Sequence, residues 1–166
     1  MSIQEQVVRW RDASEVRSIV LTTDGLAYAE GVRDGRLPID PLLSVLGARI
    51  TAVDGPGRLV LTATPGAGHL NLGGLVHGGF LSAVMDGALG MAVHSTLPAG
   101  QSCPHLQASY RFITAALAGA ELSVTAEVLR SGRRIGHARA TVTTADGTLV
   151  ATGESTHAVV SVAEFS

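Results

Sequence analysis

Asp86 raises a chemical question, because it stands in a segment, residues 78–93, that is otherwise almost wholly apolar. A carboxylate in such surroundings is costly unless it is hydrogen-bonded to the backbone, paired, or used in chemistry. At helical spacing it falls within a stripe of small residues: Gly79, Ser82, Ala83 and Gly90. Because small side chains let another backbone come close, we expect Asp86 to face a neighbouring element, in this chain or in a second subunit.

The flanking sequence predicts the elements that must hold this helix. Apolar spacing predicts an amphipathic helix over residues 4–22, a loop with Gly31, Gly35 and Pro38, and a short helix over residues 39–46. Alternating or β-branched runs predict six strands: 48–53, 58–63, 107–113, 121–128, 135–144 and 148–160. Turn residues separate several of them, above all at Asp54-Gly55-Pro56-Gly57 and Asp146-Gly147.

This order of elements predicts the fold class. A helix that is apolar nearly all round must be enclosed, and an antiparallel sheet long enough to wrap it is what the strands supply. We therefore expect an α+β domain over residues 41–166 with a helical extension over residues 1–40. The side chains expected to fill the concave side of the sheet are Phe80, Leu81, Val84, Met85, Ala88, Leu89, Met91 and Ala92.

Composition narrows the class of protein. The chain has 166 residues, a net charge of -2 and an apolar fraction of 46%, which suits one folded domain and gives no basic footprint for nucleic acid. Its most apolar segment is interrupted by Ser82, Asp86 and glycines, so no membrane span is expected. The single cysteine, Cys103, and a charged N-terminus without a signal-peptide core lead us to expect a cytoplasmic protein.

Several well-known catalytic motifs do not occur in the sequence. There is no G-x-S-x-G elbow, no H-E-x-x-H, no C-x-x-C and no phosphate-binding G-x-x-x-x-G-K-[ST] loop, and Gly66-Ala67-Gly68 does not continue as a dinucleotide fingerprint. These gaps disfavour serine hydrolases, zinc enzymes, P-loop enzymes and nicotinamide oxidoreductases. We expect no metal site.

The segment NLGGLVHGG, residues 71–79, followed seven residues later by Asp86, resembles the signature of the hotdog-fold acyl-CoA thioesterases of the PaaI type. The resemblance runs from about Leu46 to about Val160. It implies a hotdog fold, in which a sheet wraps a central helix, and hydrolysis of an acyl-CoA to a free carboxylic acid and coenzyme A. It implies no cofactor, since coenzyme A is part of the substrate.

The resemblance also implies roles for four residues. The amide of Gly78, at the helix start, would bind the thioester carbonyl, where free N–H groups and the helix dipole favour developing negative charge. Asp86 would activate water as a general base or attack the carbonyl itself. His77 would orient the loop or polarise the carbonyl, and Asn71 would hold the water or the carbonyl. Three of these residues also have a purely structural explanation. Asp86 could be a buried carboxylate hydrogen-bonded to the backbone, His77 a structural histidine of the loop, and Asn71 a turn or N-cap residue.

Further residues are candidates for substrate contact. Gly79 stands beside the proposed oxyanion donor. Cys103 falls where relatives often have Ser or Thr helping to hold the attacking water, although a merely packed cysteine is the simpler explanation. His105 stands where relatives commonly have an acidic residue. Three arginines in a predicted turn could bind the phosphates of coenzyme A, although a solvated hairpin tip explains them with fewer assumptions: Arg130, Arg133 and Arg134.

Helix geometry predicts that one chain does not complete this site. Nine residues of helix place Asp86 roughly 13 Å along the axis from His77, too far for both to act on one carbonyl carbon. Two antiparallel helices across a two-fold axis would bring the Gly78 end of one to Asp86 of the other. We therefore expect a homodimer with two composite sites, and the sequence neither supports nor excludes a tetramer.

Two other functions are compatible with the same scaffold. Hydratases and dehydratases of acyl thioesters usually carry a different arrangement of His and Asp, and turnover of crotonyl-CoA without thiol release would favour them. A non-catalytic acyl-CoA binder would keep the pocket without productive chemistry. The variant Asp86→Asn distinguishes this alternative from an enzyme. An enzyme should lose thiol release, whereas a binder should show little thiol release before or after the substitution.

Overall fold

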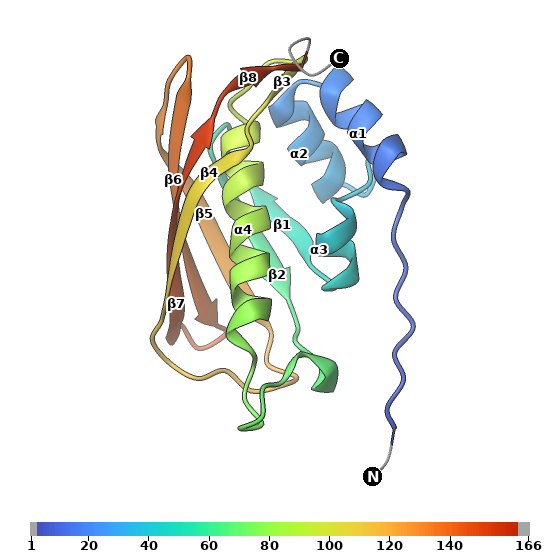
Figure 1. Ribbon diagram of the computed structural model, residues 1–166, viewed down its shortest axis with the longest axis vertical. Helices are drawn as coiled ribbons and strands as arrows, with labels where there is room; N and C mark the ends of the chain where they lie inside the picture. Colours follow the sequence, from blue (N-terminus) through green and yellow to red (C-terminus); the bar gives the residue numbers. More distant parts are fainter. Residues whose placement is uncertain (1–2, 163–166) are drawn as a thin grey trace.

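A single long helix, α4 (Gly78–His94), lies at the centre of the computed structural model, which describes residues 3–162. A six-stranded antiparallel sheet curves around one side of α4, and three shorter helices cover part of the opposite side (Figure 1). The expected α+β architecture, an antiparallel sheet wrapped around a long helix, is confirmed.

The six strands of the sheet lie in the order β1-β2-β5-β6-β7-β4. They form where the sequence predicts strands, with these bounds: β1 (Arg49–Val53), β2 (Arg58–Ala63), β4 (His105–Phe112), β5 (Leu122–Ser131), β6 (Ile135–Thr144) and β7 (Leu149–Ala158). Two short strands that the sequence does not predict, β3 (Gln101–Ser102) and β8 (Val160–Ser161), pair with each other. Within residues 3–162, β4 pairs with β7 alone, so it is an edge strand.

Side-chain alternation explains why the sheet wraps the helix. In β5, Leu122, Val124 and Ala126 are buried, while the residues between them are only partly so. All eight α4 side chains expected in the core are buried, and Met85, Ala88, Leu89 and Ala92 are completely so. The stripe of small residues lies outside this core, since Gly79 is exposed and Ser82, Ala83, Asp86 and Gly90 are half-buried.

The first helix is shorter than the sequence predicts. Helix α1 spans Ala13–Thr22, and its start is fixed by Asp12, whose carboxylate accepts a hydrogen bond from the Ser14 N–H at 2.8 Å. The prediction of helix over residues 4–12 is wrong, because this segment runs as an extended arm (Figure 1). Its apolar residues have no core to pack against, as Val7 at 86% exposure shows, and a short helix needs such packing.

The loop predicted with Gly31, Gly35 and Pro38 is wrong at Gly31, which lies in a second helix, α2 (Gly25–Arg33), whereas Gly35 and Pro38 do lie in a loop. Asp24 caps this helix by accepting from the amides of Leu26 and Ala27. Its glycines serve close packing rather than turns: a Cβ on Gly25 would lie 1.9 Å from the carbonyl oxygen of His94. This reason becomes visible only when α2 is placed against the end of α4.

The predicted short helix is present as α3 (Pro41–Val45), capped by Asp40 and begun by a proline. Tyr28 of α2 and Leu43 of α3 belong to the same hydrophobic core as α4. The division of the chain at residue 40 stays a prediction. The loop before α4 contains one 3-10 turn, η1 (Ala67–His69), and no helix within residues 3–162 is long and apolar enough to cross a membrane.

Candidate active site

His77 caps the start of α4. Its Nδ1 accepts a hydrogen bond from the Gly79 N–H at 2.8 Å, so the proton of the neutral imidazole sits on Nε2. The N–H groups of Phe80 and Leu81 both donate to the His77 carbonyl, at 3.0 and 3.4 Å. In the first turn, Gly78 is therefore the residue whose N–H has no acceptor among residues 3–162. A free N–H at a helix start can stabilise negative charge.

Gly78 lines a cavity of about 260 Å³ together with Asn71, Leu81 and Phe112. A Cβ on Gly78 would lie 3.0 Å from the Phe112 ring, so the glycine lets this ring lie directly against the helix start.

Asn71 shapes the loop that leads to this cavity. Its Oδ1 accepts from the N–H groups of Gly73 and Leu75, at 2.8 and 3.2 Å. The turn role that the sequence left open is therefore present. The Nδ2 group of Asn71 makes no hydrogen bond with any residue in 3–162, so it remains able to donate to a ligand.

Asp86 lies in the middle of α4 with a side chain that is 49% exposed. The Tyr110 hydroxyl donates to its Oδ1 at 3.3 Å, and Nε2 of His105 lies 3.5 Å from the same oxygen. Nε2 of His105 has no hydrogen bond by geometry, so its contact with Asp86 is electrostatic and strengthens when the imidazole is protonated. Burial, and then the charge of Asp86, raises the pKa of Tyr110 to about 12, which keeps the proton on the phenol.

A second histidine supports His105 from behind. The His157 ring lies 4.0 Å from the His105 ring, and its nitrogens contact the Cys103 carbonyl at 2.9 Å and the Ser155 hydroxyl at 2.8 Å. Cys103 itself donates from Sγ to the Gly90 carbonyl at 3.5 Å, and burial raises the pKa of its thiol to about 12. Cys103 is thus a protonated thiol packed against the small-residue stripe.

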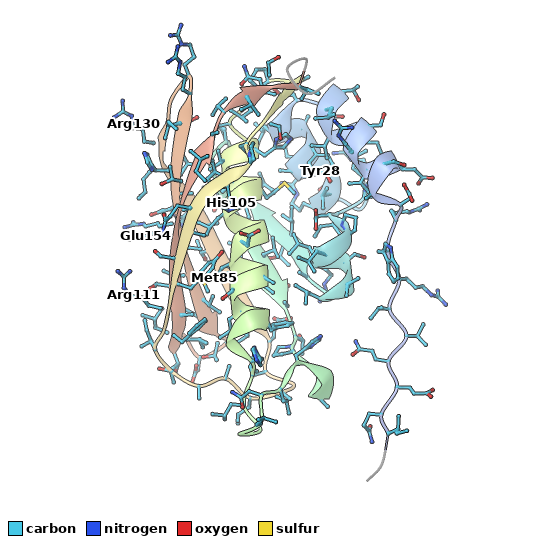
Figure 2. All side chains as sticks on the ribbon, in the orientation of Figure 1. Tyr28, Met85, His105, Arg111, Arg130 and Glu154 are labelled. Carbon is cyan, nitrogen blue, oxygen red and sulfur yellow. The ribbon has the colours of Figure 1, made fainter. Side chains whose placement is uncertain are left out.

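Sequence reasoning gave neither Tyr110 nor His105 a position beside Asp86. The pairing of β4 with β7 sets the strand along the middle of α4, and Tyr110 stands opposite Gly153 in this pairing. A Cβ on Gly153 would lie 2.9 Å from the Tyr110 ring, so the glycine makes room for the ring. In Figure 2, His105 lies where β4 passes α4.

The three arginines proposed for phosphate binding are exposed and unpaired among the described residues, in or beside the turn between β5 and β6: Arg130, Arg133 and Arg134. This turn lies at the C-terminal end of α4, because Ser131, the last residue of β5 before the turn, is hydrogen-bonded to Thr96 at 2.8 Å. Figure 2 shows Arg130 at this end of the sheet. Within one chain, the arginines and Gly78 are thus at opposite ends of the helix.

Gly78 and Asp86 are also separated within one chain. They stand eight residues apart on α4, which corresponds to about 12 Å along the helix axis. Asp86 lines a different cavity, of about 250 Å³, together with His105, Gly90 and His94. One chain therefore presents the free amide and the carboxylate in two separate cavities.

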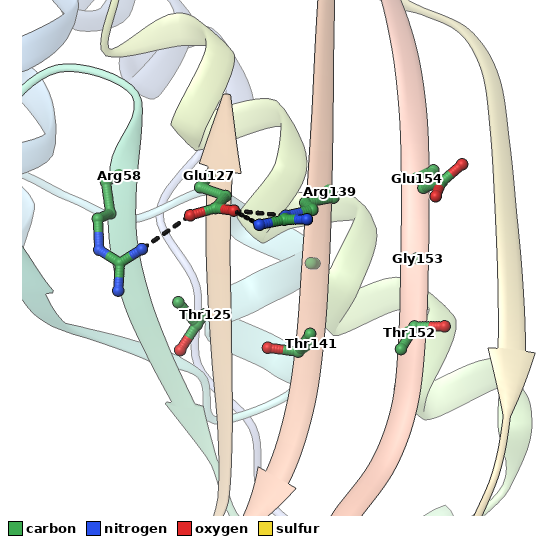
Figure 3. Close-up of a pocket in the computed structure, with 9 residues that line it drawn as sticks. Arg58, Thr125, Glu127, Arg139, Thr141, Thr152, Gly153 and Glu154 are labelled. Atoms are coloured by element: carbon green, nitrogen blue, oxygen red, sulfur yellow. Dashed lines mark hydrogen bonds and ion pairs between the residues drawn. The ribbon is translucent and has the colours of Figure 1, made fainter. Parts of the chain in front are cut away.

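A further hollow lies on the face of the sheet turned away from α4. It has a volume of about 650 Å³ and is lined by threonines and by charged side chains. Glu127 receives a hydrogen bond from Arg58 at 2.8 Å and a second from Arg139, so these charges satisfy one another (Figure 3). Within residues 3–162 no group of three or more His, Cys, Asp or Glu side chains is placed to hold a metal ion.

Comparisons with known proteins identify the family. A family model for the thioesterase superfamily matches residues 73–151, from the loop before α4 into β7. A phenylacetic acid degradation-related protein from Ralstonia eutropha JMP134 is 33% identical, with 79% of this chain and 98% of that chain covered and a TM-score of 0.73. The chain belongs to the thioesterase superfamily. No curated protein sequence matches it significantly.

Other solved structures resemble this thioesterase. The Escherichia coli PaaI protein has a TM-score of 0.72 at 24% identity, covering 84% of this chain and 96% of its own. A hypothetical thioesterase protein from Streptococcus pneumoniae TIGR4, crystallised with coenzyme A, has a TM-score of 0.64 at 25% identity, with 69% and 86% covered. The sheet around α4 is therefore the hotdog fold of the PaaI type, and the protein is a thioester hydrolase.

Proposed function

We propose that this thioesterase hydrolyses acyl-CoA substrates as a homodimer, in which Gly78 of one subunit and Asp86 of the other form each active site. The observation that carries the proposal is the separation of a free helix-start amide from a half-exposed carboxylate on one helix, in two different cavities. A thioester carbonyl needs both groups within a few ångströms, and a second subunit is the means of bringing them together.

The Gly78 amide suits the oxyanion role. Since it has no acceptor among the described residues, it offers a hydrogen bond that strengthens as the carbonyl oxygen gains charge. Its neighbour Gly79 donates to His77 instead, so His77 and Gly79 act by fixing the helix start. The unbonded Nδ2 of Asn71, which lines the same cavity, is a second donor for the carbonyl or for water.

The carboxylate of Asp86 is held on one side only. Both of its contacts, with Tyr110 and His105, go to Oδ1, and Oδ2 has no partner among residues 3–162. Oδ2 is thus available to take a proton from water or to attack the thioester carbon directly. In the first route the activated water adds to the thioester carbon and the coenzyme A thiolate leaves with the proton. In the second route the carboxylate displaces the thiolate to form an acyl–aspartyl anhydride, which water then hydrolyses to the free acid and regenerated Asp86.

Two features support a dimer. The small-residue stripe along α4 would let a second α4 approach closely. Beside it, the edge strand β4 exposes apolar side chains, with Leu106 at 61% and Phe112 at 55% exposure, and an unpaired edge of this kind is a template for pairing with another strand. An antiparallel pair would also carry the partner's β5–β6 turn toward the Gly78 end, where its arginines could reach the phosphates of coenzyme A.

Mixed dimers test the composite site. Gly78→Pro removes the N–H while keeping a residue that suits the first helical position, and the extended backbone of His77 is compatible with a following proline. Asp86→Asn removes the carboxylate function. We expect each variant alone to be nearly inactive, and subunits of the two, mixed by co-expression, to recover about one quarter of the wild-type rate of thiol release, because half of the dimers regain one intact site. No recovery in verified mixed dimers would contradict a shared site.

A further inference from the structure

The cavity that contains Asp86 extends along α4 toward its C-terminal end and is lined on one side by the N-terminal helices. Its walls are largely apolar and come from all three of them: Val16 and Val20 of α1, Tyr28 of α2 and Leu43 of α3. On the α4 side it is lined by Gly87, Gly90, Met91 and His94. His94 stands eight residues beyond Asp86, about 12 Å along the axis, so the two polar groups mark the two ends of the cavity.

His94 is an unpaired polar group in this cavity. The residue is only 7% exposed, its Nε2 is buried, and neither ring nitrogen makes a hydrogen bond with any residue in 3–162. Its nearest aromatic contact is the Tyr28 ring, edge-on at 6.0 Å, and Tyr28 directs its own hydroxyl to the Pro38 carbonyl. A buried polar atom without a partner costs stability, so its presence calls for a ligand or another explanation.

His157 differs from His94 in its hydrogen bonding. That imidazole is also buried, yet both of its nitrogens have partners. The fold therefore satisfies one buried histidine and leaves the other unsatisfied against a cavity.

The charges around this cavity limit what its far end can accept. Burial lowers the pKa of His94, so the imidazole is neutral and offers one donor and one acceptor. Asp40 and Asp86 line the same cavity, and Asp24 lies near the His94 ring. These carboxylates would repel a negatively charged group, whereas they would not repel a neutral hydroxyl, which could pair with the free imidazole.

We propose that this cavity receives the acyl part of the substrate and that His94 selects acyl groups with a neutral hydrogen-bonding group, such as a hydroxyl, at the end far from the thioester. The inference rests on the proposed function, because the thioester must lie beside Asp86 for its acyl group to reach His94. It assigns the N-terminal helices, which line part of the cavity, to substrate selection.

The test compares kcat/KM for hexanoyl-CoA, its ω-hydroxy analogue and its ω-carboxy analogue. We expect the wild-type enzyme to prefer the hydroxy substrate over hexanoyl-CoA by roughly three- to tenfold, the effect of one hydrogen bond, and to hydrolyse the carboxy substrate most slowly. His94→Leu should abolish the preference while hexanoyl-CoA is still hydrolysed, and His94→Gln should restore part of it. The matched control is His137→Leu, which removes a histidine bonded to Thr156 on the opposite face of the sheet and should leave the preference unchanged.

A cavity-filling variant gives a second, independent readout. Val20→Phe adds bulk from α1 without touching Asp86, so it should reduce hydrolysis of hexanoyl-CoA much more than that of acetyl-CoA. Equal loss for the two substrates, or a hydroxyl preference that survives in a folded His94→Leu enzyme, overturns the inference and leaves the proposed function standing. A wild-type enzyme that releases thiol from none of a broad panel of acyl-CoAs overturns the proposed function, and this inference with it.

Discussion

Tyr110 donates a hydrogen bond to Oδ1 of Asp86 across the gap between β4 and α4, at 3.3 Å. The residue that holds the carboxylate thus comes from the edge strand of the sheet rather than from the helix itself. A strand that paired with the free edge of β4 would therefore contact the element that positions Asp86. In the proposed dimer, subunit pairing and orientation of the carboxylate are coupled through this strand.

Tyr110→Phe removes this hydrogen bond and keeps the ring that packs against Gly153. We expect kcat to fall about tenfold, since a hydrogen bond to a charged group that orients the reacting carboxylate is lost. Thiol release at saturating acyl-CoA measures it, and the thermal unfolding temperature should change little. A variant with wild-type kcat would show that Asp86 needs no orientation from β4.

Gly78→Pro should lower kcat by about 10²–10³-fold, the usual effect of removing one oxyanion donor. Gly78→Ala is the matched control, because it brings a similar contact with Phe112 but keeps the N–H. The alanine variant should retain most of the activity once the Phe112 ring has shifted. Similar losses in both variants would point to crowding of the cavity instead of loss of the donor.

Changing Arg130, Arg133 and Arg134 together to Gln should raise KM for acyl-CoA roughly tenfold and leave kcat within about a factor of two, because phosphate contacts bind substrate and transition state alike. The dependence of KM on salt concentration should weaken as well. Arg17→Gln, on the exposed face of α1, is the control for a general loss of positive charge. An unchanged KM in the triple variant would show that these arginines are solvated and do not bind the substrate.

Gly25→Ala should destabilise the whole fold by about 3 kcal/mol, because a Cβ would lie 1.9 Å from a backbone oxygen that cannot move aside. Gly66→Ala is the control, since nothing lies within 4 Å of the Cβ built there. Urea unfolding monitored by circular dichroism measures both. A single transition shifted to lower urea is expected. A separate early transition would show that residues 1–40 unfold independently of the sheet.

Two buried histidines should make stability depend on pH. Burial lowers the pKa of His94 and of His157, so both stay neutral in the folded protein where the unfolded chain takes up protons. Stability is then complete well above pH of about 6.5 and is lost as the pH falls through that value, by up to about 1.4 kcal/mol per pH unit for each group. Urea unfolding between about pH 7.5 and about pH 5.5 measures the slope. His94→Leu should reduce the dependence of stability on pH. An unchanged slope would contradict a contribution of His94 to this dependence.

The sequence alone determined the elements whose signals are local. The apolar helix around Asp86, the six strands and the short helix α3 follow from periodicity, turn residues and a first-turn proline, which act between neighbours in the chain. Helix α2 could not be predicted in this way, because Gly25 and Gly31 look like turn residues until the segments they pack against are in place. Residues 4–12 could not be predicted correctly for a related reason. Their apolar residues have helical spacing, but they have no core to pack against.

For the site, the sequence supplied the groups and the tertiary structure supplied their surroundings. The motif around His77 and the rise of one helix were enough to place Gly78 and Asp86 at a fixed separation, since both lie on α4. The contacts of Asp86 with Tyr110 and His105, and the unpaired His94 at the end of its cavity, depend on strand register and on helices packed from distant parts of the chain. Such contacts join residues far apart in sequence, and no local pattern encodes them.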